Sequence, residues 1–261
     1  MSTYVKRYNP DRSPEWNYGG RKWKLSRSKI EFFIECPRCF YLDNKLGTKR
    51  PSMPSFTLNN AVDTLLKKEF DQHRTTQTVH PLLLKHNLNL LPFKHIDLEE
   101  WRDTFAGITV LHEPTGMYVS GAVDDIWINE QGELIVVDYK ATSKEGSITT
   151  LSDSAWEEQY KRQMGVYQWL LKQKGFQVDS IGYFVYANAL TSSDMFGDRL
   201  FFETTLIQCQ GETDWIDNVL ISIFNILESD TYPDSGAECE FCSYRTACGK
   251  KLQAMYEKRQ N

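Results

Sequence analysis

The chain has 261 residues, of which 41% are hydrophobic and 13% aromatic, so it can bury a core of ordinary size in one large domain or two small ones. Six cysteines are too few for a disulfide scaffold at this length, and a net charge of −5 excludes a uniformly basic nucleic-acid coat. No apolar run resembles a signal peptide or reaches the length of a membrane span, so we expect a cytoplasmic protein without a membrane partner.

Two helices are predicted in the first third of the chain. Serine caps followed by apolar residues at helical spacing predict a helix within 26–42. The pattern of 55–74 predicts a second helix. Its buried face is expected to consist of Leu58, Val62, Leu65, Leu66 and Phe70.

The middle of the chain predicts strands. Residues 117–128 and 133–142 flank the turn NEQG, in which Gly132 supplies a left-handed position for a hairpin. A helix is expected from about Ala155 to Lys174, then strands over 181–189 and 199–206 and a helix over 214–229. This order predicts a mixed α/β domain with helices around a central sheet.

The predicted hairpin carries the chemistry. Asp138 and Lys140 are two residues apart in LIVVDYKA, so they share one face of a strand. If the turn is centred near Gln131, Asp124 lies opposite Asp138, and two facing carboxylates repel unless a cation compensates them. Mg²⁺ or Mn²⁺ suits such oxygen ligands. Lys140 beside the ion could orient the attacking water, help to deprotonate it, or stabilise charge at the phosphate; the alternative is a surface Asp138–Lys140 pair.

Two further features lie outside the hairpin. Gln163 and Tyr167 are four residues apart, so they share one helix face and could reach the site; the alternative is a tyrosine packed in the core and a solvated glutamine. Cysteines at both ends of the chain have metal-binding spacing: Cys36 and Cys39 near the start, and Cys239, Cys242 and Cys248 near the end.

These motifs together resemble the RecB-like branch of the PD-(D/E)XK nuclease superfamily over roughly residues 25–250. GAVDD matches the motif of the first metal-binding aspartate, VVDYKAT the central motif and Q-x3-Y the helix motif near the active site. The resemblance implies a restriction-endonuclease-like αβββαβ core in one domain, 1–261. It assigns catalytic roles to Asp124, Asp138, Lys140, Gln163 and Tyr167, and places the metal ion on Asp124, Asp138 and the carbonyl of Tyr139.

The cysteines resemble those of the CRISPR-adaptation nucleases and of AddAB-type nuclease domains. That resemblance implies a 4Fe–4S cluster on Cys36, Cys239, Cys242 and Cys248, which would join segments 1–50 and 236–261. The additional Cys39 allows an alternative, a tetrahedral Zn²⁺ site on Cys36, Cys39, Cys239 and Cys242. The spacing of Cys248 favours the iron–sulfur interpretation.

The sequence departs from the RecB-like pattern at Asp63. The branch often carries a metal-binding histidine on the helix before the hairpin, and Asp63 occupies the corresponding position here. An aspartate is a competent ligand for a hard cation, so Asp63 is a candidate third metal ligand. The alternative is a solvated residue that pairs with Lys67 at i, i+4.

The expected function is a metal-dependent DNA nuclease that processes ends of single-stranded or unwound DNA in DNA repair. The alternatives are a non-catalytic nucleic-acid-binding or scaffold subunit, and a nuclease active only with a helicase or CRISPR-type partner. Charge supports a phosphate-binding surface: residues 1–50 hold twelve Lys/Arg and five Asp/Glu, and the tail is basic again. Two solvated termini are the alternative explanation.

Overall fold

A computed structural model of the protein describes residues 8–51, 56–152 and 154–260. The chain forms two compact units. The central unit is Pro54–Asp217, and the terminal unit combines Met1–Met53 with Asn218–Asn261. Within the described residues no helix is both long enough and apolar enough to cross a membrane.

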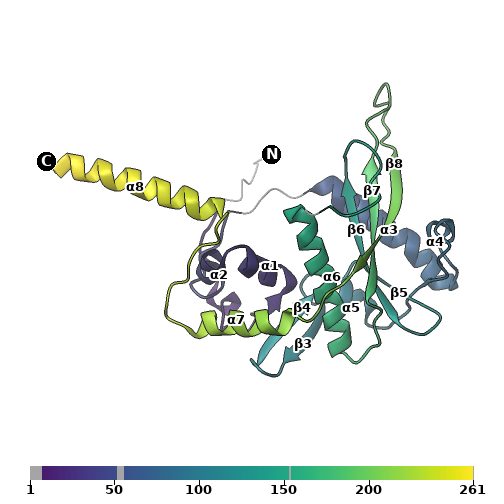
Figure 1. Cartoon of the computed structure of the whole chain (residues 1–261), viewed down its shortest axis with the longest axis horizontal. Coiled ribbons are helices and arrows are strands. Elements are labelled where there is room, and N and C mark those ends of the chain that lie inside the picture. Colours follow the sequence, from purple (N-terminus) through teal and green to yellow (C-terminus); the bar gives the residue numbers. More distant parts are fainter. Residues whose placement is uncertain (1–7, 52–55, 153, 261) are drawn as a thin grey trace, which may run out of the picture. The chain divides into compact units, whose positions relative to one another are not determined.

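A five-stranded mixed sheet forms the centre of the central unit (Figure 1). Its strands, in spatial order, are β2 (Leu91–Pro92), β5 (Asp125–Ile128), β6 (Leu134–Thr142), β7 (Ile181–Ala189) and β8 (Phe202–Gln210). β6 and β7 are parallel, whereas the other neighbouring strands are antiparallel. Helix α6 (Ala155–Gln173) makes the crossover that a parallel pair requires.

The predicted hairpin forms, but the strand expected over 117–128 is two strands. β4 (Met117–Gly121) pairs with β3 (Ile108–His112), and β5 pairs with β6. The break at residues 122–124 is where the chain leaves one strand pair for the other, so Asp124 stands just outside the β5 ladder. Gly132, with φ of +83°, supplies the left-handed position of the turn as predicted.

The two faces of β6 pack differently because successive side chains alternate across a strand. Ile135, Val137 and Tyr139 belong to a buried cluster with Phe70 and Trp127. Asp138 and Lys140 point to the opposite face, where α6 provides Gln163. The long apolar run before Asp138 is therefore buried on both sides, as its composition predicts.

Helix α3 (Thr57–Thr76) extends beyond the part of the central unit that it covers. Phe70 is fully buried against Trp127, with ring centroids 5.2 Å apart. Leu58 and Leu65 are exposed, so the prediction that they belong to the buried face was wrong. Only the C-terminal part of this helix carries the fully buried apolar residue. Two short helices follow it, α4 (Pro81–Lys85) and α5 (Leu98–Arg102).

The terminal unit brings segments from near both ends of the chain together. Its elements are the 3-10 turn η1 (Pro14–Trp16), β1 (Leu25–Ser26), α1 (Arg27–Glu35), α2 (Pro37–Asn44), most of α7 (Ile216–Glu228) and α8 (Glu240–Gln260). Arg38 Nε donates to the carbonyl of Pro233 at 3.0 Å, and Tyr41 donates to the carbonyl of Ser229 at 3.3 Å. The two segments of this unit are thus held by direct hydrogen bonds across almost 200 positions of sequence.

Candidate active site

The turn of the hairpin brings Asp124, which directly precedes β5, next to β6, which carries Asp138. Asp125 pairs with Val137 and Ile128 with Leu134, so the register is centred on residue 131 as predicted. Asp124 directly precedes β5, and its Oδ2 accepts a hydrogen bond from the backbone amide of Tyr139 at 3.0 Å. The pairing of β5 with β6 therefore holds the carboxylate of Asp124 beside Tyr139, the residue that follows Asp138.

Asp138 is almost fully buried and is held by two polar side chains. Gln163 Nε2 donates to Asp138 Oδ1 at 2.7 Å, and Lys140 forms an ion pair with Asp138 Oδ2. Lys140 Nζ also donates to Gln163 Oε1 at 3.1 Å, and Gln163 Nε2 lies 3.0 Å from the hydroxyl oxygen of Tyr167. The four predicted residues Asp138, Lys140, Gln163 and Tyr167 thus form one connected polar cluster.

Lys140 is largely buried beside two carboxylates. Burial opposes its charge, but the carboxylates of Asp138 and Asp124 outweigh this effect and raise the pKa of Lys140 above its ordinary value. The Tyr160 ring lies 4.3 Å from the ammonium nitrogen, which adds a cation–π contact. In this arrangement the ammonium of Lys140 contacts Asp138 and Gln163 and can stabilise nearby negative charge.

The third candidate ligand, Asp63, lies beside a lysine that sequence reasoning did not place in the site. Lys67 Nζ is 3.0 Å from Asp63 Oδ2 and 3.3 Å from Asp124 Oδ1, so this ammonium bridges the two carboxylates. Burial, followed by the charge of Asp124, raises the pKa of Asp63. The i, i+4 spacing of Asp63 and Lys67 was a sufficient cue for that pair, but the contact of Lys67 with Asp124 depends on tertiary packing.

The donor set suits a hard divalent cation. Asp124 and Asp138 provide carboxylate oxygens, and Mg²⁺ is commonly bound by one or two carboxylates with water completing its shell. Asp63, Asp124 and Asp138 do not form a group whose ligand atoms all lie within 4.8 Å; among the described residues only four cysteines do so. The carboxylates therefore fit a sparsely ligated Mg²⁺ or Mn²⁺ ion better than an enclosed all-protein cage.

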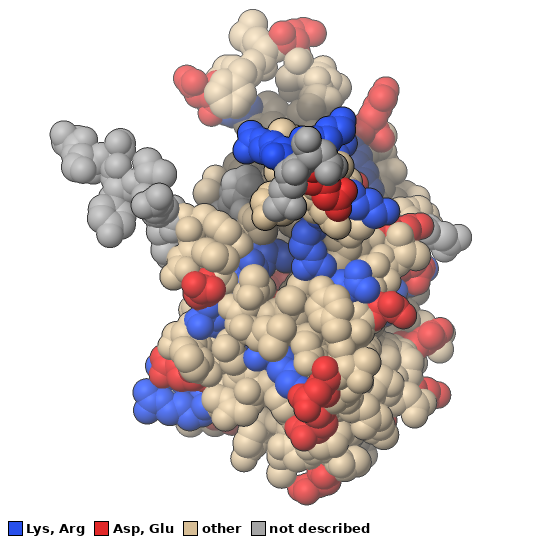
Figure 2. All heavy atoms as spheres, turned by 90° about the vertical axis from the view of Figure 1, so that its left-hand side faces the viewer, with Lys and Arg blue, Asp and Glu red and all other residues tan. Residues whose placement is uncertain are grey.

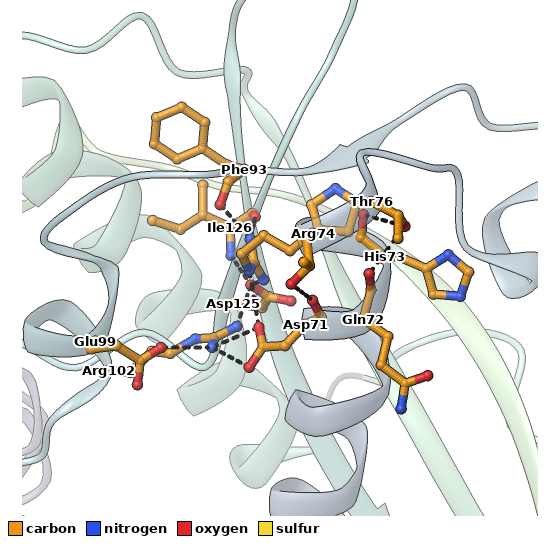
Figure 3. Close-up of polar contacts among 12 residues, drawn as sticks. Asp71, Gln72, His73, Arg74, Thr76, Phe93, Glu99, Arg102, Asp125 and Ile126 are labelled. Carbon is orange, nitrogen blue, oxygen red and sulfur yellow. Dashed lines mark hydrogen bonds and ion pairs between the residues drawn. The ribbon is translucent and has the colours of Figure 1, made fainter.

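Next to Asp124 in the sequence is a second carboxylate, that of Asp125, in a different environment (Figure 3). Asp125 is fully buried, and its Oδ1 accepts from Arg102 at 2.9 Å and also pairs with Arg74. Tyr139 donates from its hydroxyl to Asp125 Oδ2 at 2.7 Å. Asp71 bridges the same two arginines at 2.9 Å each. This network joins α3, α5 and the hairpin.

The network supports the site through Tyr139. The backbone amide of Tyr139 holds Asp124, whereas its hydroxyl holds Asp125. Sequence reasoning missed this network. The Asp-Asp doublet was visible, but the two arginines that neutralise Asp125 lie 51 and 23 positions away, and no spacing rule connects them.

The four cysteines that lie together in the terminal unit are Cys36, Cys39, Cys239 and Cys242, all of them buried. Sγ separations are 3.7 Å for Cys36–Cys242, 3.7 Å for Cys39–Cys239 and 3.4 Å for Cys39–Cys242. The structure therefore brings together three of the four cysteines assigned from the resemblance, with Cys39 in the place of Cys248. Cys248 is only partly buried.

The family comparison agrees with this geometry. The model of the PD-(D/E)XK nuclease superfamily matches residues 24–249. The chain belongs to this superfamily. The restriction-endonuclease-like α/β fold predicted from the sequence is confirmed by the mixed sheet with flanking helices and by this match.

Among solved structures, one described as "Crystal structure of SSO0001" shares 16% sequence identity and covers 80% of this chain and 79% of its own, with a TM-score of 0.40. No curated protein matches the sequence. Membership of the PD-(D/E)XK nuclease superfamily implies a nuclease with a nucleic-acid substrate and a divalent metal ion.

Proposed function

We propose that this protein is a Mg²⁺- or Mn²⁺-dependent DNA nuclease whose active site is the cluster around Asp124, Asp138 and Lys140. The observation that carries the proposal is the hydrogen-bonded set Asp138–Lys140–Gln163–Tyr167 beside Asp124. A buried carboxylate and ammonium at the end of an apolar strand are costly to maintain for stability alone, and such groups gather at functional sites.

In this proposal Asp124, Asp138 and the carbonyl of Tyr139 hold the metal ion, and Asp63 is a further ligand. The ion, when bound, acts as a Lewis acid at the phosphodiester and lowers the pKa of water that it binds. Lys67 forms ion pairs with both Asp63 and Asp124, so it would keep these carboxylates in place before a cation arrives.

Lys140 is proposed to stabilise the negative charge that develops on the attacked phosphate. Its raised pKa keeps it protonated, and Asp138 and Gln163 fix its ammonium group. Gln163 orients both Lys140 and Asp138, since its amide oxygen accepts from the first and its amide nitrogen donates to the second. Tyr167 is proposed to hold Gln163 in this orientation from the next turn of α6.

In its details the proposal follows the resemblance to RecB-like nucleases: the enzyme would trim ends of single-stranded or unwound DNA. It would act in DNA repair in the cytoplasm, with 1–261 as one nuclease domain. The resemblance also implies a 4Fe–4S cluster as its second cofactor. A nuclease active only with a helicase or CRISPR-type partner, and a non-catalytic DNA-binding subunit, are the competing functions.

The face of the protein in Figure 2 is not uniformly basic. On the face that Figure 2 displays, Lys and Arg side chains alternate with Asp and Glu. Six of the basic residues of the N-terminal segment are ion-paired: Arg12, Arg21, Lys22, Arg38, Lys45 and Arg50. Binding of DNA by the terminal unit alone should therefore be weak and strongly dependent on salt.

The test is cleavage of end-labelled linear and circular DNA, single- and double-stranded, with Mg²⁺ or Mn²⁺. Lys140→Ala should abolish cleavage, whereas the matched control Lys144→Ala should retain it, because Lys144 pairs with Glu157 and is half exposed. Cutting of linear but not circular DNA would support end processing. Metal-loaded protein that binds DNA and never cuts it, alone or with added helicase, would refute the nuclease.

A further inference from the structure

We propose that Cys36, Cys39, Cys239 and Cys242 bind a single tetrahedral Zn²⁺ ion, in place of the four-iron cluster that the resemblance implies. This inference concerns the terminal unit and does not depend on the proposed nuclease activity. It rests on the spacing of the sulfur atoms, on the polar groups around them and on the position of Cys248.

Sulfur spacing distinguishes the two centres. Four thiolates at about 2.3 Å from one Zn²⁺ ion, at tetrahedral angles, lie about 3.8 Å from one another. The three Sγ pairs measured here are 3.4–3.7 Å apart, and all four sulfurs lie within 4.8 Å. In a four-iron cluster each cysteine binds a different iron atom, so an iron–iron edge is added between any two ligand sulfurs. The cysteines here are too closely spaced for that arrangement.

Both pairs of ligands lie at helix N-termini. Cys36 is the N-cap of α2 and Cys39 is in its first turn; Cys239 directly precedes α8 and Cys242 is in its first turn. Free backbone amides and the positive end of the helix dipole stabilise thiolates at these positions. The amides of Cys39 and Gly236 donate to Cys36 Sγ at 3.4 and 3.3 Å.

Gly236 is required for this approach of the backbone. A Cβ atom at this position would lie 2.0 Å from the carbonyl oxygen of Glu35, so only glycine brings the amide this close to Cys36. The loop before the second C-x2-C segment thus donates a hydrogen bond, through the Gly236 amide, to Cys36 of the first. Such outer hydrogen bonds orient the ligands of a metal ion.

Two arginines lie beside the sulfurs and oppose their negative charge. Four thiolates and one Zn²⁺ ion carry a net charge of −2, and two guanidinium groups lie at the sulfurs. Arg50 is 3.7 Å from Cys239 Sγ, and Arg245 is 3.8 Å from Cys242 Sγ. Arg50 also pairs with Glu35 at 3.6 Å, and both guanidinium groups place positive charge beside the thiolates.

Cys248 lies too far along α8 to join this centre. It follows Cys242 by six residues, which is about 9 Å along a helix axis. Its side chain is partly exposed and interacts with Tyr244 on the same helix. For Cys248 to replace Cys39 as a ligand, the first two turns of α8 would have to unwind.

The test uses the full chain, produced with added iron and purified without oxygen, in matched variants Cys39→Ser and Cys248→Ser. We expect about one zinc and no acid-labile sulfide per wild-type chain. Exchange into Co²⁺ should give the intense visible bands of a tetrahedral tetrathiolate ion. Cys248→Ser should keep its zinc, and Cys39→Ser should lose zinc to a chelator at least about tenfold more readily.

The opposite pattern would overturn the inference: iron and sulfide in the wild-type protein, with visible absorption that survives in Cys39→Ser and disappears in Cys248→Ser. Wild-type protein that folds without any bound metal would overturn it as well. If Cys39→Ser is insoluble, the metal content of the wild-type chain and of Cys248→Ser decides the question. None of these measurements uses nuclease activity, so failure of the proposed function would leave them unaffected.

Discussion

Replacing Asp125 with asparagine should destabilise the central unit far more than the same change at Asp71, although both carboxylates contact the same two arginines. The side chain of Asp125 is 0% exposed, and those of Arg74 and Arg102 are 9% and 7% exposed. Asp125→Asn leaves this buried network with an uncompensated positive charge. Removing one partner of a buried ion pair costs about 3–5 kcal/mol.

Asp71 is the matched control because its side chain is 39% exposed. Solvent screens its interactions, so Asp71→Asn should cost less than about 1 kcal/mol. At an m-value of about 2 kcal/mol/M, Asp125→Asn should lower the urea midpoint by about 1.5–2.5 M and Asp71→Asn by less than about 0.5 M. Far-UV circular dichroism would follow both transitions.

The reasoning would be refuted if the two variants had the same midpoint, or if Asp71→Asn were the less stable. A second consequence separates charge from packing. Adding Arg102→Met to Asp125→Asn removes the uncompensated cation, so the double variant should be more stable than the sum of the two single changes predicts. Strict additivity would show that the buried charge is not the source of the loss.

Two other predictions concern packing and pH. Gly121→Ala places a Cβ 2.8 Å from Cε1 of Tyr167, so it should cost about 1–3 kcal/mol of stability and slow cleavage by displacing Tyr167; unchanged melting and cleavage would contradict the close contact. Burial, assisted by the charge of Arg12 and opposed by that of Asp43, lowers the pKa of Lys29 from 10.5 to about 8. Between pH 8 and 10.5 Lys29 is therefore deprotonated in the folded state but still protonated in the unfolded state, so the free energy of unfolding should rise with pH over this range. Lys29→Met should therefore lose this rise in stability between pH 8 and 10.5, and the same pH dependence in wild type and variant would argue against a buried charged lysine.

The local part of the candidate site was predictable from the sequence because it depends on strand geometry. The two-residue period of a strand places Asp138 and Lys140 on one face, and a symmetric turn about residue 131 sets the register of the hairpin. The i, i+4 spacing of Gln163 and Tyr167 likewise places these two side chains on one face of α6. Sheet order and the break between β4 and β5 depend on packing over long sequence distances and left no local trace.

Two other features show where pattern reasoning stops. Apolar spacing along α3 indicates a helix, but it cannot say that the helix extends beyond the surface it covers, so Leu58 and Leu65 were assigned to a face that is exposed. In the cysteine segments, spacing alone left Cys39 and Cys248 as alternatives. The helical rise of α8 separates them, because it carries Cys248 away from the sulfurs while Cys39 stays at the N-terminus of α2.

The cysteine centre also has a consequence for synthesis on the ribosome. Its two halves are separated by 200 residues, so at about 5–20 residues per second the first pair waits about 10–40 s for the second. During that interval the whole of Pro54–Asp217 emerges as one continuous segment and can fold first. Cys36 and Cys39 meanwhile stay exposed as a vicinal thiol pair, open to oxidation or to capture of metal. The proposed metal centre can therefore form only after Cys239 and Cys242 have emerged, and supply of metal at that stage would determine whether the two cysteine pairs join.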